Sequence, residues 1–255
     1  MAARAIVIKS ESELACMRQA GSLLAEVLQL LVQEVRPGLT TAHMDALADR
    51  ELKRRGAIPS FKGYRGFPAS LCVSINDEVV HGIPGDRVMA EGDIVALDVG
   101  AIYQGYQADA AVTVPVGKVS PQAQRLIEAT RGALEAGIAT ARAGGRLGDI
   151  SAAIQGHAES RGFSVVREYV GHGIGKEMHE EPAVPNFGLP GRGPLLKAGM
   201  ALALEPMVNA GGWRTRLAED GWTVLTADGS LSAHFEHTIA ILDGGAQVMT
   251  APPGD

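Results

Sequence analysis

Cysteine is almost absent from this chain of 255 residues, which contains only Cys16 and Cys72. Two cysteines so far apart form no C-x-x-C pair, and they are too few to hold a fold of this size together by disulfides. A protein of this kind is suited to a reducing compartment. We therefore expect a cytoplasmic location.

Long apolar runs are also missing. The first residues contain only a short apolar run at 5–8 before Lys9, well short of the core of a secretory signal. The longer run at 27–32 is interrupted by Gln29, and no segment reaches the ~18 apolar residues of a membrane span. The sequence predicts a soluble protein that does not enter a membrane.

An excess of positive charge is the third missing feature. The net charge is −6, so the chain offers no basic surface for a nucleic-acid substrate. Apolar residues make up 46% of the chain, which is ordinary for a globular protein with a large core. No linker or low-complexity tract divides it, so we predict a single domain over residues 1–255.

The predicted elements alternate between helices and strands. Ser10 and Glu13 form a capping box that begins a helix, which should run until Pro37 and Gly38. Three further helices are expected at about 41–55, 121–142 and 147–161. Strands are expected at 71–75, 94–102 and 108–116, and then near Val165, Ala201 and Leu231. The segment 180–193, rich in proline and glycine, should be a long loop.

Two sequence landmarks indicate an internal repeat. Arg36-x-Gly38 recurs as Arg142-x-Gly144, and the Arg-Gly pair at 55–56 recurs at 161–162, both at an offset of 106 residues. A shared offset favours two related halves, about 10–118 and 121–250, with a site at their seam. The alternative is that helical segments often end in Arg-Gly, because glycine commonly stops a helix.

Asp98 and Asp109 stand in strand-like runs on either side of a turn signal at Gln104-Gly105. A hairpin folded there sets the two carboxylates roughly opposite each other, where like charges are destabilising unless a cation neutralises them. The alternative is that one aspartate caps the turn or faces solvent.

Further ligand-type residues follow in the second half. His172 and His179 stand in GHGIGKEMHEEP, where the glycines should let the backbone approach a ligand. Glu205 ends the apolar run MALALEPMV, and Glu236 stands within SAHFEHTIAI. Each carboxylate alone could be an edge-strand charge. Four carboxylates with an imidazole instead predict a catalytic site for Mn²⁺, Fe²⁺, Co²⁺ or Zn²⁺.

Two such ions, ~3.5–4 Å apart between bridging carboxylates, would hold a hydroxide and perform hydrolysis. The motifs of rival enzymes are missing from the chain: H-E-x-x-H, G-x-S-x-G, G-x-x-x-x-G-K and the dinucleotide fingerprint.

The same residues, in this order, with VSINDEVVHGIP, GHGIGKEMHEEP, ALEPM and SAHFEHTIAI, closely resemble the type I methionine aminopeptidases over nearly the whole chain. The resemblance implies an α+β pita-bread fold, in which two pseudo-symmetric halves with an antiparallel sheet covered by helices hold a dinuclear metal site between them. It also implies an activity: removal of the initiator methionine from nascent proteins whose second residue is small, by attack of a metal-activated hydroxide on the scissile carbonyl.

The resemblance further implies a division of roles among the metal ligands. Asp98 would hold one ion, His172 and Glu205 the other, and Asp109 and Glu236 would bridge the pair. The two ions would be Co²⁺, Mn²⁺, Fe²⁺ or Zn²⁺.

It implies catalytic and binding roles as well. Glu205 would help to deprotonate the attacking water, His179 would stabilise the oxyanion, and His81 would contact the scissile amide. For His81 the alternative is an ordinary loop histidine. The methionine pocket would be formed by Tyr64, Phe67, Cys72 and Trp222, which could otherwise be plain core.

Two positions depart from the family pattern. Met178 stands where many relatives carry an aromatic residue, and His234 where glutamine is usual, which affects the detail of the pocket. No extension precedes the first helix, so any ribosome contact would be transient and use the domain surface. We expect a monomer.

Two alternatives remain open. Prolidases and aminopeptidase P use the same fold and a similar ligand set on X-Pro bonds, although they normally carry a large additional N-terminal domain. A catalytically dead relative could instead serve as a binding module, but such proteins lose metal ligands.

Overall fold

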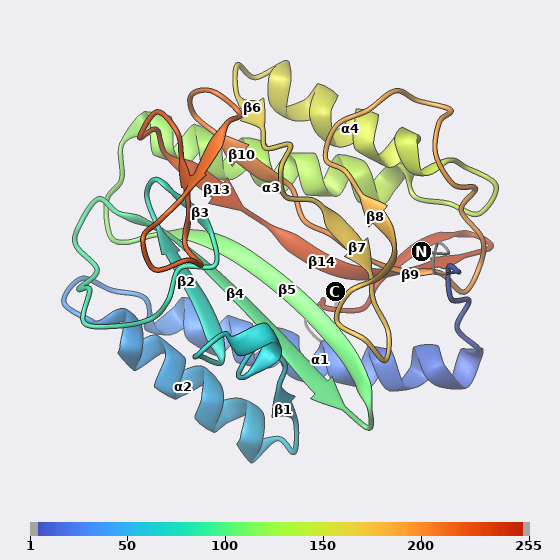
Figure 1. The fold of residues 1–255 in the computed structure, drawn as a ribbon, viewed down its shortest axis with the longest axis horizontal. Helices are drawn as coiled ribbons and strands as arrows, with labels where there is room; N and C mark the ends of the chain where they lie inside the picture. Colours follow the sequence, from blue (N-terminus) through green and yellow to red (C-terminus); the bar gives the residue numbers. More distant parts are fainter. Residues whose placement is uncertain (1–4, 252–255) are drawn as a thin grey trace.

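The protein consists of a nine-stranded antiparallel sheet flanked by four α-helices, in a computed structural model that describes residues 5–251. The helices are α1 (Glu11–Glu34), α2 (Thr41–Arg54), α3 (Pro121–Thr140) and α4 (Leu147–Glu159). Figure 1 shows α1 and α2 along one side of the molecule and α3 and α4 along the other, with the strands between them. Within residues 5–251, no helix combines the length and the apolar character that crossing a bilayer requires.

The large sheet joins strands from both parts of the sequence. Its order is β1 (Ile58–Pro59), β4 (Ile94–Tyr103), β5 (Tyr106–Pro115), β14 (Glu236–Leu242), β9 (Ala201–Leu204), β7 (Gly171–Gly173) and β8 (Glu180–Val184). In addition, β2 (Leu71–Ile75) pairs with β4, and β15 (Gly245–Val248) pairs with β14. The β5–β14 pair therefore connects the earlier strands with the later ones.

Short elements complete the chain. One small sheet contains β6 (Ser164–Val165), β10 (Met207–Asn209) and β13 (Ser232–His234). The other contains β3 (Glu78–Val80), β11 (Thr215–Leu217) and β12 (Val224–Thr226). A 3₁₀ turn, η1 (Tyr64–Gly66), precedes β2.

Helix starts follow the local capping signals. At α1 the Ser10 hydroxyl accepts from the Glu13 N–H, and the Glu13 carboxylate accepts from the Ser10 N–H, which completes the predicted capping box. All four helices end one to three residues earlier than predicted. At α1 the reason is local, because Arg36 precedes Pro37 and the helical conformation is disfavoured there.

Strand alternation separates the core from the acidic residues. On β4, Leu97 and Val99 belong to the apolar core that includes α1 and α2. On β14, Ile239 and Ile241 belong to a second core that includes α3 and α4. Because neighbouring side chains on a strand point to opposite faces, Asp98 projects away from the helices.

The β4–β5 hairpin turns at Gln104 and Gly105, whose φ angles of 51° and 80° are those of a type I′ turn. This turn pairs Asp98 with Ala111, and Asp109 with Gly100. The aspartates are therefore diagonal neighbours on one face, two residues away from the expected position roughly opposite each other. The difference arises because the tight turn at 104–105 fixes the register.

The prediction of a long loop at 180–193 was partly wrong. Its first five residues form β8, which pairs with β7 at the end of the sheet order. Pro182 is tolerated there because an edge strand leaves backbone groups on one side unpaired. The remaining residues, 185–193, are irregular and reach α4, where the Gly191 N–H donates to Asp149 Oδ1.

Candidate metal centre

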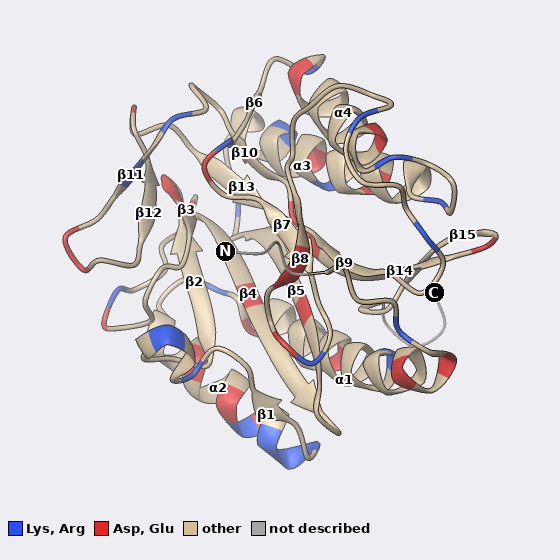
Figure 2. Ribbon diagram, turned by 45° about the vertical axis from the view of Figure 1, so that its right-hand side comes forward, with Lys and Arg blue, Asp and Glu red and all other residues tan. Residues whose placement is uncertain are grey.

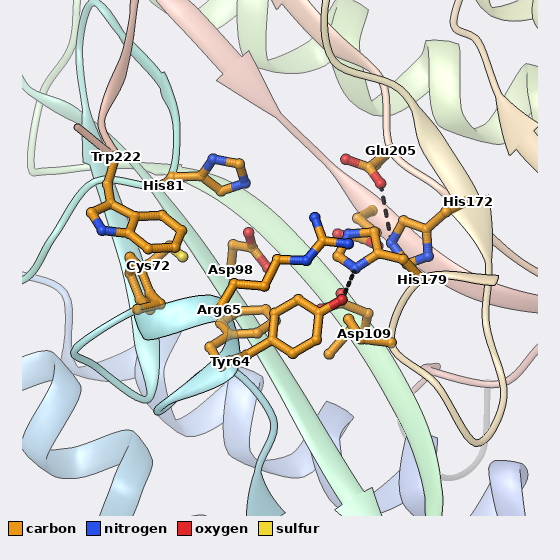
Figure 3. Close-up of a pocket in the computed structure, with 14 residues that line it drawn as sticks. Tyr64, Arg65, Cys72, His81, Asp98, Asp109, His172, His179, Glu205 and Trp222 are labelled. Atoms are coloured by element: carbon orange, nitrogen blue, oxygen red, sulfur yellow. Dashed lines mark hydrogen bonds and ion pairs between the residues drawn. The ribbon is translucent and has the colours of Figure 1, made fainter. Parts of the chain in front are cut away.

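All eleven residues predicted for the site line one cavity of about 150 Å³. Figure 3 shows labelled side chains converging on it from strands and loops of both halves of the sequence. Its lining consists of Phe61, Tyr64, Arg65, Phe67, Cys72, His81, Asp98, Asp109, His172, Met178, His179, Glu205, Trp222 and Glu236.

Four neighbouring strands supply the carboxylates. Asp98 lies on β4, Asp109 on β5 and Glu236 at the first position of β14, while Glu205 directly follows β9. Figure 2 shows the acidic segments of β4 and β5 between the two helix pairs. Because Glu236 pairs with Ala111 across the β5–β14 contact, the second half delivers its carboxylate next to the aspartates of the first.

These carboxyl groups are largely removed from solvent. Burial raises the pKa of Asp98 to about 7. Burial and then the neighbouring carboxylates raise the pKa of Asp109, Glu205 and Glu236 well above the ordinary range. Within residues 5–251, the ion pairs made by this group involve only histidine partners. Three buried acids and the half-buried Glu205, without a lysine or arginine partner, are costly to ionise.

The donor atoms fit a divalent cation. Asp98 Oδ1, Asp109 Oδ1 and Glu236 Oε1 are buried without a hydrogen-bond partner in the described part of the chain. Ligand atoms of Asp109, His172 and Glu236 all lie within 4.8 Å of one another. Carboxylate oxygens with an imidazole are the donors of catalytic sites for ions such as Mn²⁺, Fe²⁺ and Zn²⁺.

His172 presents one defined ring nitrogen to this group. Its Nδ1 lies 2.9 Å from the Gly173 carbonyl oxygen, which can only accept, so Nδ1 carries the proton of the neutral ring. Nε2 keeps its lone pair and lies 3.5 Å from Glu205 Oε1. A backbone carbonyl behind a histidine is a common way to orient a metal ligand.

The two glycines that flank His172 allow close packing of the strands. A Cβ at Gly171 would collide with the Ala203 carbonyl, and one at Gly173 with the backbone of Glu181. Both residues leave room for β7 between β8 and β9.

His179 lies next to His172, with ring centroids 4.2 Å apart. It stacks on Tyr64, whose hydroxyl lies 2.9 Å from His179 Nδ1. Burial, then the nearby His172 and Arg65, lowers the pKa of His179 to about 3, so the ring is neutral. When the phenol donates to Nδ1, Nε2 keeps its proton and can act as a donor.

His81 has a left-handed backbone, with φ of 62°, which is uncommon for a residue with a side chain. Strain of this kind often occurs at functional positions. The ring contacts Tyr169 edge-on at 5.9 Å, and burial lowers the pKa of His81.

An apolar pocket adjoins the carboxylates. Phe67 and Cys72 are buried in one cluster, and the Trp222 ring meets Phe67 edge-on at 5.2 Å. Cys72 is paired with Asp98 across β2 and β4, so the pocket begins directly beside the first carboxylate. Burial, followed by the negative charges of neighbouring carboxylates, raises the pKa of the Cys72 thiol.

Phe61 and Arg65 also line the cavity but were not predicted. Arg65 has a left-handed φ of 50°, and its guanidinium lies 5.3 Å from the centre of the Tyr64 ring. Figure 3 shows this side chain extending toward His179. Nothing in the local sequence signals this conformation, because the neighbouring glycines are compatible with many turns.

Comparisons with known proteins agree with this geometry. The model of metallopeptidase family M24 matches residues 15–243. A methionine aminopeptidase from Clostridium perfringens is 53% identical over 245 residues, covering 96% of this chain and 98% of that protein. Methionine aminopeptidase 1 from Bacillus subtilis is 50% identical, covering 96% and 99%.

Among solved structures, a methionine aminopeptidase from Thermotoga maritima is similar with a TM-score of 0.96. It shares 48% identity, and the match covers 97% of this chain and all of that one.

Proposed function

The chain belongs to metallopeptidase family M24, and from this premise we propose how its cavity acts on a peptide. The α+β pita-bread fold predicted from the sequence is confirmed by the similarity to solved structures. The chain is a metal-dependent aminopeptidase that removes the initiator methionine from proteins whose second residue is small. The observation that carries this function is a group of four carboxylates, three of them buried and Glu205 half-buried, beside an apolar pocket.

For the metal, we propose two divalent ions in the roles inferred from the resemblance. Asp98 would hold one ion, His172 and Glu205 would hold the other, and Asp109 and Glu236 would be shared by both. The ions would be Co²⁺, Mn²⁺, Fe²⁺ or Zn²⁺. When bound, they polarise the scissile carbonyl and lower the pKa of water so that it can attack at neutral pH.

The apolar pocket binds the methionine side chain. Aromatic rings and a neutral thiol suit a thioether, which makes favourable contacts with aromatic edges. Because Cys72 lies across from Asp98, a methionine seated between Cys72, Phe67 and Trp222 brings its amino group close to the Asp98 carboxylate. Tyr64 closes the other side through its stacking on His179. A cavity of about 150 Å³ leaves little room beyond the methionine, which favours substrates whose second residue is small.

Three side chains handle protons and charge during hydrolysis. Glu205 accepts the proton of the attacking water. His179 donates from Nε2 to the oxygen that becomes negative in the transition state. His81 contacts the amide nitrogen that leaves.

We also propose the setting in which this reaction occurs. One catalytic domain, built from related halves at about 10–118 and 121–250, acts as a monomer in the cytoplasm on nascent chains. Contact with the ribosome is transient and uses the domain surface. Neither a nucleic-acid substrate nor a membrane takes part.

The function is tested by incubating protein loaded with Co²⁺ or Mn²⁺ with Met-Ala-Ser, Met-Leu-Ser and an X-Pro dipeptide. We expect methionine release from Met-Ala-Ser and little from Met-Leu-Ser. No methionine release from Met-Ala-Ser would contradict the proposal. Cleavage of the X-Pro dipeptide alone would identify a prolidase instead.

A further inference from the structure

His234 is a buried imidazole that the proposed mechanism does not use. It is the last residue of β13 and stands two residues before Glu236. Its exposed fraction is 1%, and it occupies the position where the family resemblance leads us to expect glutamine. A histidine enclosed so completely needs partners for both ring nitrogens.

The backbone of His234 is held firmly. Its N–H donates to Thr113 Oγ1 at 2.8 Å, and the same hydroxyl donates to the His234 carbonyl at 2.8 Å. The residue also pairs with Met207 on β10. The backbone that carries the His234 ring is therefore fixed in position.

The ring nitrogens, in contrast, have no partner. Neither Nδ1 nor Nε2 makes a hydrogen bond to any group within residues 5–251, and both atoms are buried. The Nε2 atom of His234 lies 3.8 Å from Oε2 of the Glu236 carboxylate. That distance is too long for a hydrogen bond.

The same distance suits two ligands of one ion. Nitrogen and oxygen ligands lie about 2.0–2.2 Å from ions such as Zn²⁺, so two of them are separated by at most roughly 4.4 Å. Donor atoms of Glu205, His234 and Glu236 all lie within 4.8 Å of one another. Small side-chain movements therefore suffice for all three to reach one cation.

We infer that His234 is an additional nitrogen ligand of the ion held by Glu205 and Glu236. The inference rests on the proposed function, because it adds a ligand to that site. With His172, this ion would have two imidazole ligands. Imidazole suits Zn²⁺ and Fe²⁺, whereas oxygen ligands suit Mn²⁺ and Mg²⁺. His234 therefore shifts the metal preference of the site toward Zn²⁺ and Fe²⁺.

The test compares metal binding by the full chain and by His234→Gln, after removal of bound metal. His237→Gln is the matched control, because His237 is also a histidine of this region but its Nδ1 lies 2.8 Å from Thr250 Oγ1. Titration calorimetry with Zn²⁺ should show at least ~10-fold weaker binding in His234→Gln, a loss of the size known for disrupted metal sites. Mn²⁺ binding should change less. His237→Gln should bind both ions as the unaltered chain does.

X-ray absorption of the Zn²⁺-loaded proteins counts nitrogen ligands directly. His234→Gln should lose one imidazole scatterer, and His234→Ala should give the same result if the glutamine variant folds poorly. Equal Zn²⁺ affinity with an unchanged imidazole count would overturn the inference, as would weaker binding without loss of an imidazole, which would mean that His234 only orients Glu236. Failure of the proposed function is distinct, because the unaltered chain would then bind no divalent ion or release no methionine.

Discussion

The backbone of Asp109 is held in place by two hydrogen bonds to one threonine side chain. Its N–H donates to Thr238 Oγ1 at 2.9 Å, and the Thr238 hydroxyl donates to the Asp109 carbonyl at 2.9 Å. Thr113 holds His234 in the same way. In both cases a buried threonine hydroxyl on a strand completes the backbone pairing next to a charged or polar side chain.

Thr238→Val is expected to remove this support with little change in volume. The Asp109 N–H would then be buried without an acceptor, which costs about 1–3 kcal/mol of unfolding free energy. Urea unfolding of the metal-free proteins measures this loss of unfolding free energy. Thr238→Ser keeps the hydroxyl and should lose less, so equal losses for the two variants would argue against the hydrogen bonds.

Glu236→Ala and Asp109→Ala should each abolish methionine release, because each removes a proposed bridge between the two ions. Metal analysis after dialysis should find both ions reduced. His237→Gln, which leaves the cavity untouched, serves as the control. Retained activity in Glu236→Ala would contradict the ligand assignment.

His179→Ala should leave metal binding intact and slow turnover by ~10²–10³, the usual effect of losing a donor to the oxyanion. Tyr64→Phe removes only the hydroxyl that contacts His179 Nδ1 and should have a smaller effect on kcat. Steady-state kinetics and metal analysis on the same samples separate the two roles. Loss of bound metal in His179→Ala would make it a ligand instead.

At the scale of elements, α1 and α2 are joined by a cluster of charged side chains that do not line the cavity. Arg55 Nη1 lies 2.7 Å from Glu51 Oε2, and Arg55 Nε lies 3.2 Å from Glu26 Oε2 on α1. Arg54 also contacts Glu51, at 2.8 Å. Hydrogen bonds from Arg55 and then Arg54 lower the pKa of Glu51 to about 2.

This cluster predicts a pH dependence of stability. The pKa of Glu51 is about 2 in the folded protein and 4.5 without these contacts. The Glu51 carboxylate therefore stabilises the fold above about pH 4.5, and this contribution is lost as the pH falls toward 2. Glu51→Gln should lower the urea midpoint of metal-free protein at pH 7, with a difference that shrinks below pH 4.5.

The control for this experiment is Glu128→Gln, whose carboxylate accepts a hydrogen bond from the neutral Gln124. It should show no comparable pH-dependent difference. A Glu51→Gln effect that stays constant from pH 7 to pH 3 would contradict the electrostatic explanation.

Elements were predictable where their signals are local. Ser10 and Glu13 fix the start of α1 within one turn, and Gln104-Gly105 fixes the hairpin. Strand β8 was missed because Pro182 and the proline and glycine residues that follow it resemble a loop, and its register with β7 is irregular. Local patterns cannot report such tertiary pairing.

At the scale of the whole molecule, both halves of the sequence contribute residues to the site. Asp98 and Asp109 come from the first, and His172, Glu205 and Glu236 from the second. The sequence indicates the four acids because they stand in or beside apolar, strand-like runs where an unpaired charge is costly, and the family resemblance adds His172. Their roles as metal ligands stay a prediction. The sequence could not predict Arg65, whose orientation depends on a left-handed turn, nor the environment of His234, which only the packing of β13 defines.

Adding metal should therefore stabilise the molecule as one unit. Ligand binding to the folded state at 100 times Kd contributes about 2.7 kcal/mol. Thermal unfolding of EDTA-treated protein should show a lower Tm, restored by Co²⁺ or Mn²⁺ but not by Na⁺. An unchanged Tm in saturating divalent ion would contradict a metal centre between the halves.

Because β14 pairs with β5, the ligand set is completed late in the synthesis of the chain. Glu236 is the last of the proposed ligands to be translated, 138 residues after Asp98. A growing copy of this enzyme therefore carries an incomplete ligand set until synthesis passes that residue. Each new molecule is therefore inactive while it is being translated. It can process other chains only after nearly all of its strands have been made.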